Sequence, residues 1–261
     1  MTDAARGADK VAPRGGRAAL VLCATLLLAG FVALGSWQLQ RLQWKNALVA
    51  RIEQRVHAAA GAPPAAASWP QFSAGAEEYR HVRLGGVLLD HLSTQVKAVT
   101  ELGSGYWLLT PLCGADGSIV LVNRGFIAPP PGTPLPPAVR LPSGAACAPR
   151  MGAAPGAVLV TGLLRISEPG GAFLRHNDAR ANLWYSRDVA AIAQARGLAR
   201  VAPFFVDADA APAAAPGQPV GGLTVIHFNN NHLVYAITWY ALALMVAGAF
   251  VWVARDERRA R

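Results

Sequence analysis

The sequence is short of charge for its length. Aspartate, glutamate, lysine and arginine together make up 15% of the 261 residues, whereas 53% of the residues are hydrophobic. A soluble domain normally carries about 25% charged residues. The composition therefore argues against a wholly soluble protein and indicates segments that lie in a membrane.

Motifs of the common catalytic sites are also missing. The chain contains no Gly-x-Ser-x-Gly turn, P-loop, His-Glu-x-x-His helix or dinucleotide-binding glycine pattern. His81, His91 and His176 have no partners at metal-ligand spacing, and the adjacent Glu77 and Glu78 would lie on opposite faces of a strand. Because no nucleophile and base occur in a recognisable arrangement, we predict that the protein is not an enzyme.

Cysteine is scarce as well. Cys23 lies in an apolar run, Cys113 and Cys147 lie in the long middle segment, and there is no Cys-x-x-Cys motif. A cysteine-based metal cluster is therefore not indicated. Two interpretations remain for Cys113 and Cys147. They either form a disulfide in an oxidising compartment or are two unbonded thiols.

Basic residues outnumber acidic ones without marking a nucleic-acid site. The formal net charge is +9, but no run of lysine and arginine is interleaved with aromatic residues. Part of the excess lies in the two terminal tails, where it can set membrane topology and contact lipid headgroups. We therefore predict the lipid bilayer as a partner, and not nucleic acid.

Two apolar runs dominate the sequence. Residues 18–37 and residues 233–254 contain no formally charged side chain. At ~1.5 Å per residue, a helix of either length crosses a hydrocarbon core ~30 Å thick. The first run could instead be a cleaved signal peptide, although it is longer than the ~7–15 apolar residues of most signals. We predict two transmembrane helices, at residues 18–37 and 232–254.

The basic tails, residues 1–17 and 255–261, indicate the orientation. The positive-inside rule places both tails in the cytoplasm and the long loop in the periplasm. Arg41, Lys45 and other basic residues after the first run oppose this orientation, but the loop is too long for the rule to apply to it.

The middle of the chain indicates one extramembrane domain. Tryptophans and basic residues recur at helical spacing in residues 38–60, which we predict to be an amphipathic stalk at the membrane interface. Residues 61–231 contain short alternating or β-branched runs bounded by glycine, proline, aspartate or serine. The predicted strands are residues 79–89, 95–101, 106–112, 118–127, 157–165, 203–207 and 223–228, with a helix at 186–196 and irregular stretches at 128–155 and 208–220. The predicted fold is two transmembrane α-helices flanking one β-rich (α+β) extracytoplasmic domain.

An apolar strand ends in Asn123-Arg124-Gly125, which admits two interpretations. The arginine either terminates the strand by holding loop carbonyls, or it provides a docking point for a carboxylate or a partner chain. The same two interpretations apply to residues 177–178 and 182–188.

His232 is set apart by its position at the start of the second apolar run. On a helix, Tyr235 and Trp239 would follow it along one face. A neutral imidazole beside an aromatic, apolar surface suits the axial ligation of haem iron. The alternative is an interfacial histidine that caps the helix, with the aromatic residues forming an ordinary membrane belt.

Several segments, taken in order, resemble one family. They are residues 34–45 (LGSWQLQRLQWK), 78–83 (EYRHVR), 120–126 (VLVNRGF), 182–188 (NLWYSRD) and 230–240 (NNHLVYAITWY). This set is similar to the surfeit locus protein family, assembly factors of cytochrome c oxidase with two membrane helices around an extracytoplasmic domain. The resemblance covers the chain from about residue 34 to residue 240.

The resemblance implies an assembly factor of bacterial type in the inner membrane. It implies haem a as a transient cargo, the catalytic subunit of cytochrome c oxidase as the recipient, and haem a synthase as a second partner. The family's candidate haem ligand corresponds to His232. Depth and charge suggest in addition that Arg41 or Lys45 pairs with the haem propionates, while Tyr235 and Trp239 line the macrocycle. The alternative function is a cofactor-free membrane scaffold that docks oxidase subunits.

Overall fold

The computed structural model describes residues 14–130, 132–133, 136, 139–142, 147–148, 155–172, 174–211, 217–224 and 230–259. The chain divides into two compact units. One unit comprises residues 1–51 and 227–261, and the other comprises residues 52–226.

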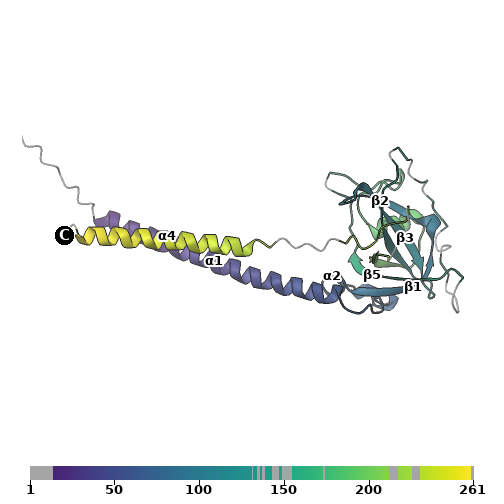
Figure 1. The fold of residues 1–261 in the computed structure, drawn as a ribbon, viewed down its shortest axis with the longest axis horizontal. Coiled ribbons are helices and arrows are strands. Elements are labelled where there is room, and N and C mark those ends of the chain that lie inside the picture. The colour runs from purple at the N-terminus through teal and green to yellow at the C-terminus, as the bar shows by residue number, and fades with distance from the viewer. Residues whose placement is uncertain are drawn as a thin grey trace, which may run out of the picture. The chain divides into compact units, whose positions relative to one another are not determined.

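The first unit is a pair of long helices, α1 (Arg14–Val56) and α4 (His232–Arg259). Figure 1 shows α4 alongside α1. The two helices are antiparallel, because Phe31 of α1 stacks on Trp239 of α4, whereas Gln38, further along α1, bonds His232 at the start of α4. Gly35 permits the close approach, since a Cβ there would lie 2.9 Å from ring carbons of Tyr240.

Both helices are long and apolar enough to cross a membrane, and only 6% and 11% of their most apolar windows are buried. The predicted fold class, with two transmembrane helices around a β-rich domain, is therefore confirmed. Phe31 and Gly35 of α1 contact α4, and the choice between a retained anchor and a cleaved signal peptide stays a prediction. The helix α1 continues without a break through the stalk that we predict at residues 38–60, as far as Val56. The boundaries of the bilayer and its sidedness stay predictions, and tail residues 1–13 lie outside the described residues.

The second unit is built on a six-stranded sheet with the order β1-β5-β6-β4-β3-β2. The β4–β6 pair is parallel and the other neighbours are antiparallel. A further β1–β3 pairing closes five strands into a ring, to which β2 is added as an edge. The strands are β1 (His81–Leu88), β2 (Thr94–Thr100), β3 (Gly103–Cys113), β4 (Ile119–Ile127), β5 (Val158–Ile166) and β6 (Val201–Ala208).

Six of the predicted strands are confirmed with boundaries that differ by a few residues. The seventh, at residues 223–228, is not seen at Leu223 and Thr224, and its other residues lie outside the described part of the chain. Short helices at η1 (Ala66–Gln71), α2 (Ala74–Glu77) and η2 (Asp90–Leu92) were not predicted, because each is shorter than the window over which helical periodicity can be recognised.

The strands β4 and β6 are buried on both faces. Successive residues of β4 enter opposite core clusters, with Leu121 on one side and Val122 on the other, and Phe205 and Val206 of β6 do the same. A strand covered on both faces gives a continuous apolar run and not an alternating one. The core is thus divided by the sheet into two layers.

The helix α3 (Val189–Arg196) covers one of these layers. It begins where the predicted cap, Asp188, accepts a hydrogen bond from the Ala191 amide, and it ends at Gly197, whose φ of 71° lies in the left-handed region. The polar segment before it, at residues 177–188, is held by its own side chains, since Asn177 Oδ1 accepts the amides of Tyr185 and Ser186. The structural interpretation therefore accounts for these polar residues.

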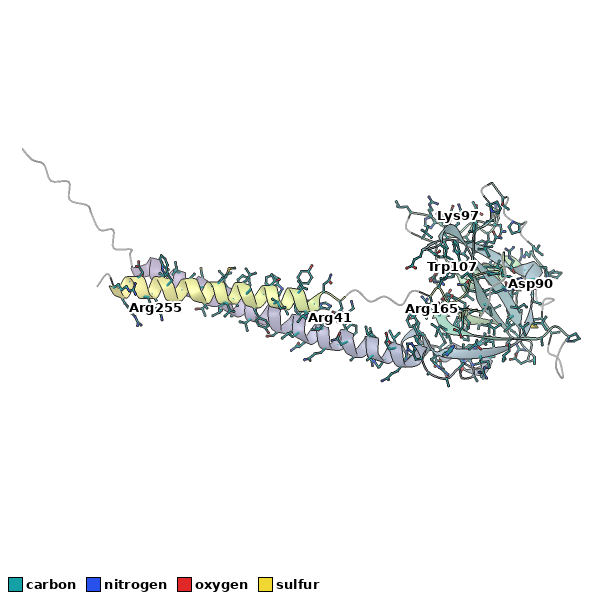
Figure 2. The ribbon with its side chains drawn as sticks, viewed as in Figure 1. Arg41, Asp90, Lys97, Trp107, Arg165 and Arg255 are labelled. Atoms are coloured by element: carbon teal, nitrogen blue, oxygen red, sulfur yellow. A yellow bond between two sulfur atoms is a disulfide. The ribbon has the colours of Figure 1, made fainter. Side chains whose placement is uncertain are left out.

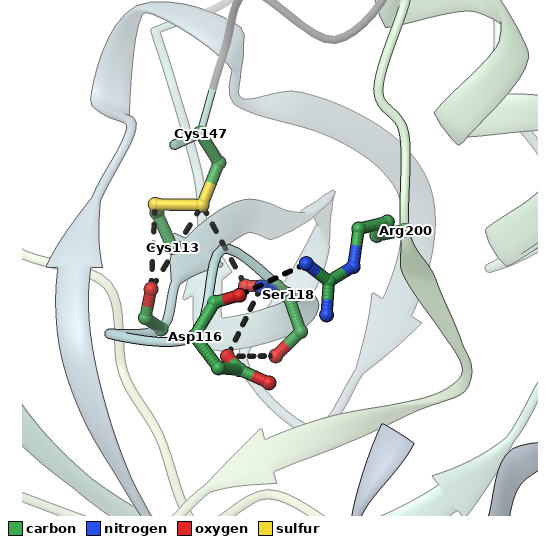
Figure 3. The surroundings of a disulfide bond; sticks show 6 residues. Cys113, Asp116, Ser118, Cys147 and Arg200 are labelled. Carbon is green, nitrogen blue, oxygen red and sulfur yellow. Dashed lines mark hydrogen bonds between the residues drawn. A yellow bond between two sulfur atoms is a disulfide. The ribbon is translucent and has the colours of Figure 1, made fainter. Parts of the chain in front are cut away.

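The proline-rich stretch at residues 128–155 is irregular where the structure describes it, and it returns to the core. Val139 and Leu141 pack against the cluster beneath α3, and the buried Arg196 donates to the Val139 carbonyl. Cys113 at the end of β3 and Cys147 form a disulfide with a Cα–Cα distance of 5.6 Å (Figure 3). Of the two interpretations of these cysteines, the disulfide is the one that the structure supports.

Loss of this disulfide should lower the free energy of unfolding of the β domain. The bond closes a loop of 34 residues, and bridges over such loops contribute about 2–4 kcal/mol. Cys147→Ser in the full chain, unfolded by urea in detergent, should therefore show a lower midpoint than the wild type, and reductant should lower the wild type to match. Cys23→Ser is the control, because Cys23 is an exposed free thiol on α1. Equal midpoints for all three proteins would contradict the prediction.

Candidate functional site

His232 is held against α1 at the first turn of α4. Its Nδ1 lies 2.7 Å from Oε1 of Gln38. Since an amide oxygen only accepts hydrogen bonds, Nδ1 is the donor and carries the proton. The tautomer of imidazole that has its proton on Nδ1 has its lone pair on Nε2, and this is the form in which a histidine binds a metal through Nε2.

A polar face of α1 surrounds this contact. Gln38, Arg41 and Lys45 are three and four residues apart, so they lie on one side of the helix. Figure 2 shows Arg41 on α1 close to the start of α4, and its guanidinium lies 4.2 Å from the centroid of the Trp44 ring. Asn230, just before α4, donates to Asn46 Oδ1 at 2.8 Å. The two predicted cationic residues are thus on the same face as the residue that bonds His232.

The aromatic residues that follow His232 are placed differently from one another. Tyr235 is 54% exposed, whereas Trp239 is partly buried and stacks on Phe31 with ring centroids 5.7 Å apart. Tyr240, one residue further, shares a hydrogen bond of 3.1 Å with Ser36. Tyr235 is therefore open to lipid or ligand, while Trp239 contributes to the helix pair; a role of either in binding stays a prediction.

A second polar cluster lies inside the β domain, around Asp207 of β6. The side chain of Asp207 is buried, and its oxygens accept hydrogen bonds from Asn123, Arg165, Arg187 and Thr224 at 2.8–3.2 Å. These residues line a cavity of about 170 Å³. Because one carboxylate satisfies two guanidinium groups and two neutral donors, the cluster ties β4, β5 and β6 to the segment before α3.

Arg187 joins this cluster to Glu168. Its Nη2 lies 2.5 Å from Glu168 Oε1, and its Nε lies 3.1 Å from Oε2, so the pair is bidentate. Burial alone would raise the pKa of Glu168, but the hydrogen bond and charge of Arg187 outweigh it and lower that pKa below its ordinary value. Burial opposes the charge of Arg187 as well, yet its two carboxylate partners raise its pKa. Both groups are charged at neutral pH.

Asn123, the first residue of the polar strand end at residues 123–125, therefore has a structural role. Asn123 is buried and joins the Asp207 cluster, while its Oδ1 accepts the Gly125 amide. The guanidinium of Arg124 pairs with the exposed Asp90 at 2.5 Å, and among the described residues it bonds no loop carbonyl. The alternation of side chains along β4 sends these two neighbours to opposite faces.

His81 of β1 connects the start of the domain to the loop after β6. Its Nε2 lies 2.7 Å from Asp209 Oδ2, and its Nδ1 lies 3.0 Å from the Ala58 carbonyl. Burial alone would lower the pKa of His81, but the hydrogen bonds to Asp209 and Ala58 reverse this, and the pKa is raised.

We expect this contact to make stability depend on pH. The folded pKa exceeds the unfolded value of about 6.5, so the contact stabilises the fold fully below that pH and loses its contribution as the pH rises through the folded pKa. His81→Gln should therefore cost stability at about pH 5.5 and less at about pH 8.5, by at most ~1 kcal/mol for a partly exposed pair. Urea unfolding at both pH values measures the difference, and an identical pH dependence in wild type and variant would contradict it.

Metal chemistry by a cluster of side chains is not indicated. Among the described residues, no group of three or more histidine, cysteine, aspartate or glutamate side chains is positioned to hold a metal ion. A haem differs because the porphyrin supplies four ligands and the protein need supply only one. Of the predicted site residues, His232, Arg41 and Lys45 belong to one region of the α1–α4 pair. Gln38, which bonds His232, was not predicted to be a site residue.

Known proteins match the chain over most of its length. A model of the SURF1 family matches residues 25–244, from within α1 to within α4. Surfeit locus protein 1 of Rattus norvegicus is 33% identical over 243 residues, which are 87% of this chain and 72% of the rat protein. The Homo sapiens protein of that name is 32% identical over 237 residues, or 84% of this chain and 71% of its own. A SURF1-like protein of Drosophila melanogaster is 29% identical over 274 residues, or 98% and 82%. Because the matched range covers the whole β domain and parts of both helices, the chain belongs to the SURF1 family.

Proposed function

We propose that this protein assists the assembly of cytochrome c oxidase by carrying haem a to the catalytic subunit. Membership of the SURF1 family supports the assembly role, which is the role that the resemblance implies. The observation that carries the haem proposal is the Gln38–His232 hydrogen bond. It fixes the imidazole by one nitrogen and leaves the other for iron.

The surroundings of His232 suit an amphipathic cargo. Haem a has an apolar body and tail and two anionic propionates. The exposed apolar surface of α1 and α4 would take the body and tail, and Arg41 or Lys45 would pair with the propionates. Tyr235 is exposed next to His232 and would contact the macrocycle. A single axial bond together with apolar contacts permits release, which a carrier requires.

The compartment belongs to the same proposal. The protein lies in the bacterial inner membrane with both termini in the cytoplasm and the β domain in the periplasm. The Cys113–Cys147 disulfide supports this orientation, because disulfides persist in oxidising compartments. Haem a synthase would supply the cargo, the oxidase catalytic subunit would receive it, and the protein itself would catalyse no reaction.

Purification from cells that make haem a tests the proposal. The wild type in mild detergent should carry haem a, measured as haem per chain by the pyridine haemochrome method. Gln38→Leu should carry less, because loss of the residue that orients a metal-binding histidine typically weakens metal binding about 10–100-fold. Gln40→Leu, an exposed glutamine on the same helix, is the matched control and should keep its haem.

The alternative, a scaffold without cofactor, predicts a different result. In that case the purified wild type would contain no haem a and would still be isolated together with the oxidase catalytic subunit. Haem-free protein of this kind would overturn the carrier role and keep the assembly role.

A further inference from the structure

Large apolar side chains are exposed at the β2–β3 hairpin of the β domain. Val99 on β2 is 83% exposed, and Leu102 in the turn is 54% exposed. Leu174 is 85% exposed, and its neighbour Arg175 lines a groove beside the hairpin. Apolar residues that gather on one region of a surface are typical of a binding site, whereas single ones are common everywhere.

A groove of about 490 Å³ runs beside this hairpin. Its walls come from the hairpin, from the segment after β4 and from the segment before α3. The residues that form it include Lys97, Val99, Pro129, Pro130, Arg175 and Tyr185. A second cavity of about 460 Å³ shares the two prolines and is lined by Leu102 and Val220. The hairpin therefore borders an extended concave surface with an apolar end.

The groove is cationic. Lys97 and Arg175 both lie 5.4 Å from the centroid of the Tyr185 ring, and no acidic side chain is among the described residues that line the groove. In the described part of the chain, neither cation forms an ion pair with a carboxylate. Figure 2 shows Lys97 on the periphery of the β domain. The groove thus complements a ligand with carboxylate groups.

One side of the groove is a strand edge that the segment before α3 covers only in part. The β2 strand is the last in the sheet order, and the Lys97 amide points away from β3 to donate to the Trp184 carbonyl. The Val99 amide, two residues along, points in the same outward direction. No backbone partner of that amide occurs among the described residues. An unpartnered amide on an edge strand is a template for one more strand.

We propose that this groove binds an extended acidic segment of a partner polypeptide. The segment adds a short strand at Val99, places a carboxylate between Lys97 and Arg175, and inserts an apolar side chain beside Leu102. A membrane surface fits less well, because a flat bilayer cannot enter a concave groove or pair with a strand edge. The proposal does not depend on haem binding.

The test uses the full chain in nanodiscs of phosphatidylcholine and a fluorescein-labelled peptide of four Glu-Val repeats. Fluorescence anisotropy should give binding at least tenfold tighter than for a peptide of four Lys-Val repeats. The double variant Lys97→Glu, Arg175→Glu should weaken binding of the acidic peptide about tenfold or more. Its control is Arg83→Glu, Arg180→Glu, which makes the same change of charge at exposed sites outside the groove and should leave the affinity within about twofold.

Val99→Pro separates strand addition from charge attraction. Proline removes only an amide that points out of the sheet, a position at which edge strands tolerate it. The variant should keep the unfolding midpoint of the wild type and lose at least tenfold in peptide affinity. Equal binding of the two peptides, or equal loss in both double variants, would overturn the proposal. Sedimentation with phosphatidylglycerol vesicles that is abolished by Lys97→Glu, Arg175→Glu, without peptide binding, would assign the surface to lipid instead.

Discussion

Asp207→Ala should lower the free energy of unfolding of the β domain by about 3–5 kcal/mol, the range for removing one partner of a buried charge network. Asp207 is 4% exposed and accepts hydrogen bonds from Arg165, Arg187, Asn123 and Thr224. Without it, Arg165 loses its nearest carboxylate and keeps Glu78 only at 3.5 Å, while Arg187 keeps Glu168 alone. The partly buried guanidinium groups then lie in the core with too few counter-charges.

Urea unfolding of the full chain in detergent measures this loss, with tryptophan fluorescence as the probe, to which the buried Trp184 contributes. Asp90→Ala is the matched control, because it also breaks an arginine–aspartate pair, but one in which Asp90 is 69% exposed. Exposed pairs contribute at most ~1 kcal/mol. An Asp207→Ala cost no larger than that of Asp90→Ala would contradict the structural role of the cluster.

The largest functional effect is expected from His232→Ala. In cells whose own copy of this protein is deleted, the variant should leave the oxidase catalytic subunit deficient in haem a, because iron loses its only proposed protein ligand. The variant should still insert into the membrane, since the contacts of Phe31 with Trp239 and of Ser36 with Tyr240 do not involve His232. Haem a per catalytic subunit, measured optically in isolated membranes, should fall by about tenfold or more.

Thr238→Ala on the same helix is the control for this prediction. Thr238 is exposed, and among the described residues its hydroxyl bonds only the Val234 carbonyl of the same helix. It should support oxidase assembly at the level of the wild type. Full haem content of the oxidase with His232→Ala would show that the histidine is dispensable and would leave only the scaffold role.

The elements of the fold could be predicted because their signals are local. Two uncharged runs indicated the long helices, alternation bounded by turn residues indicated the strands, and Asp188 and Gly197 marked the ends of α3. His232 was singled out by its place at the start of the second apolar run, and Arg41 and Lys45 by depth and charge; their roles in binding stay predictions. Each of these inferences needs only residues within a few turns of one another.

The contacts that organise the sites could not be predicted, because they depend on register between distant segments. Gln38 and His232 are 194 residues apart in sequence, and only the antiparallel alignment of α1 and α4 brings them together. Asn123 and Asp207 are 84 residues apart and meet through the parallel pairing of β4 with β6. The disulfide likewise depends on the path of the proline-rich stretch over the core, and composition does not predict that path.

The central claim is that His232 binds the iron of haem a, and one spectroscopic measurement tests it most directly. The absorption spectrum of His232→Ala, purified from cells that make haem a, is recorded before and after addition of imidazole and haem a, beside that of the wild type. We expect a Soret band of bound haem in the wild type, its loss in the variant, and its recovery when imidazole occupies the place of the missing side chain. An identical Soret band in wild type and variant without imidazole would contradict the claim.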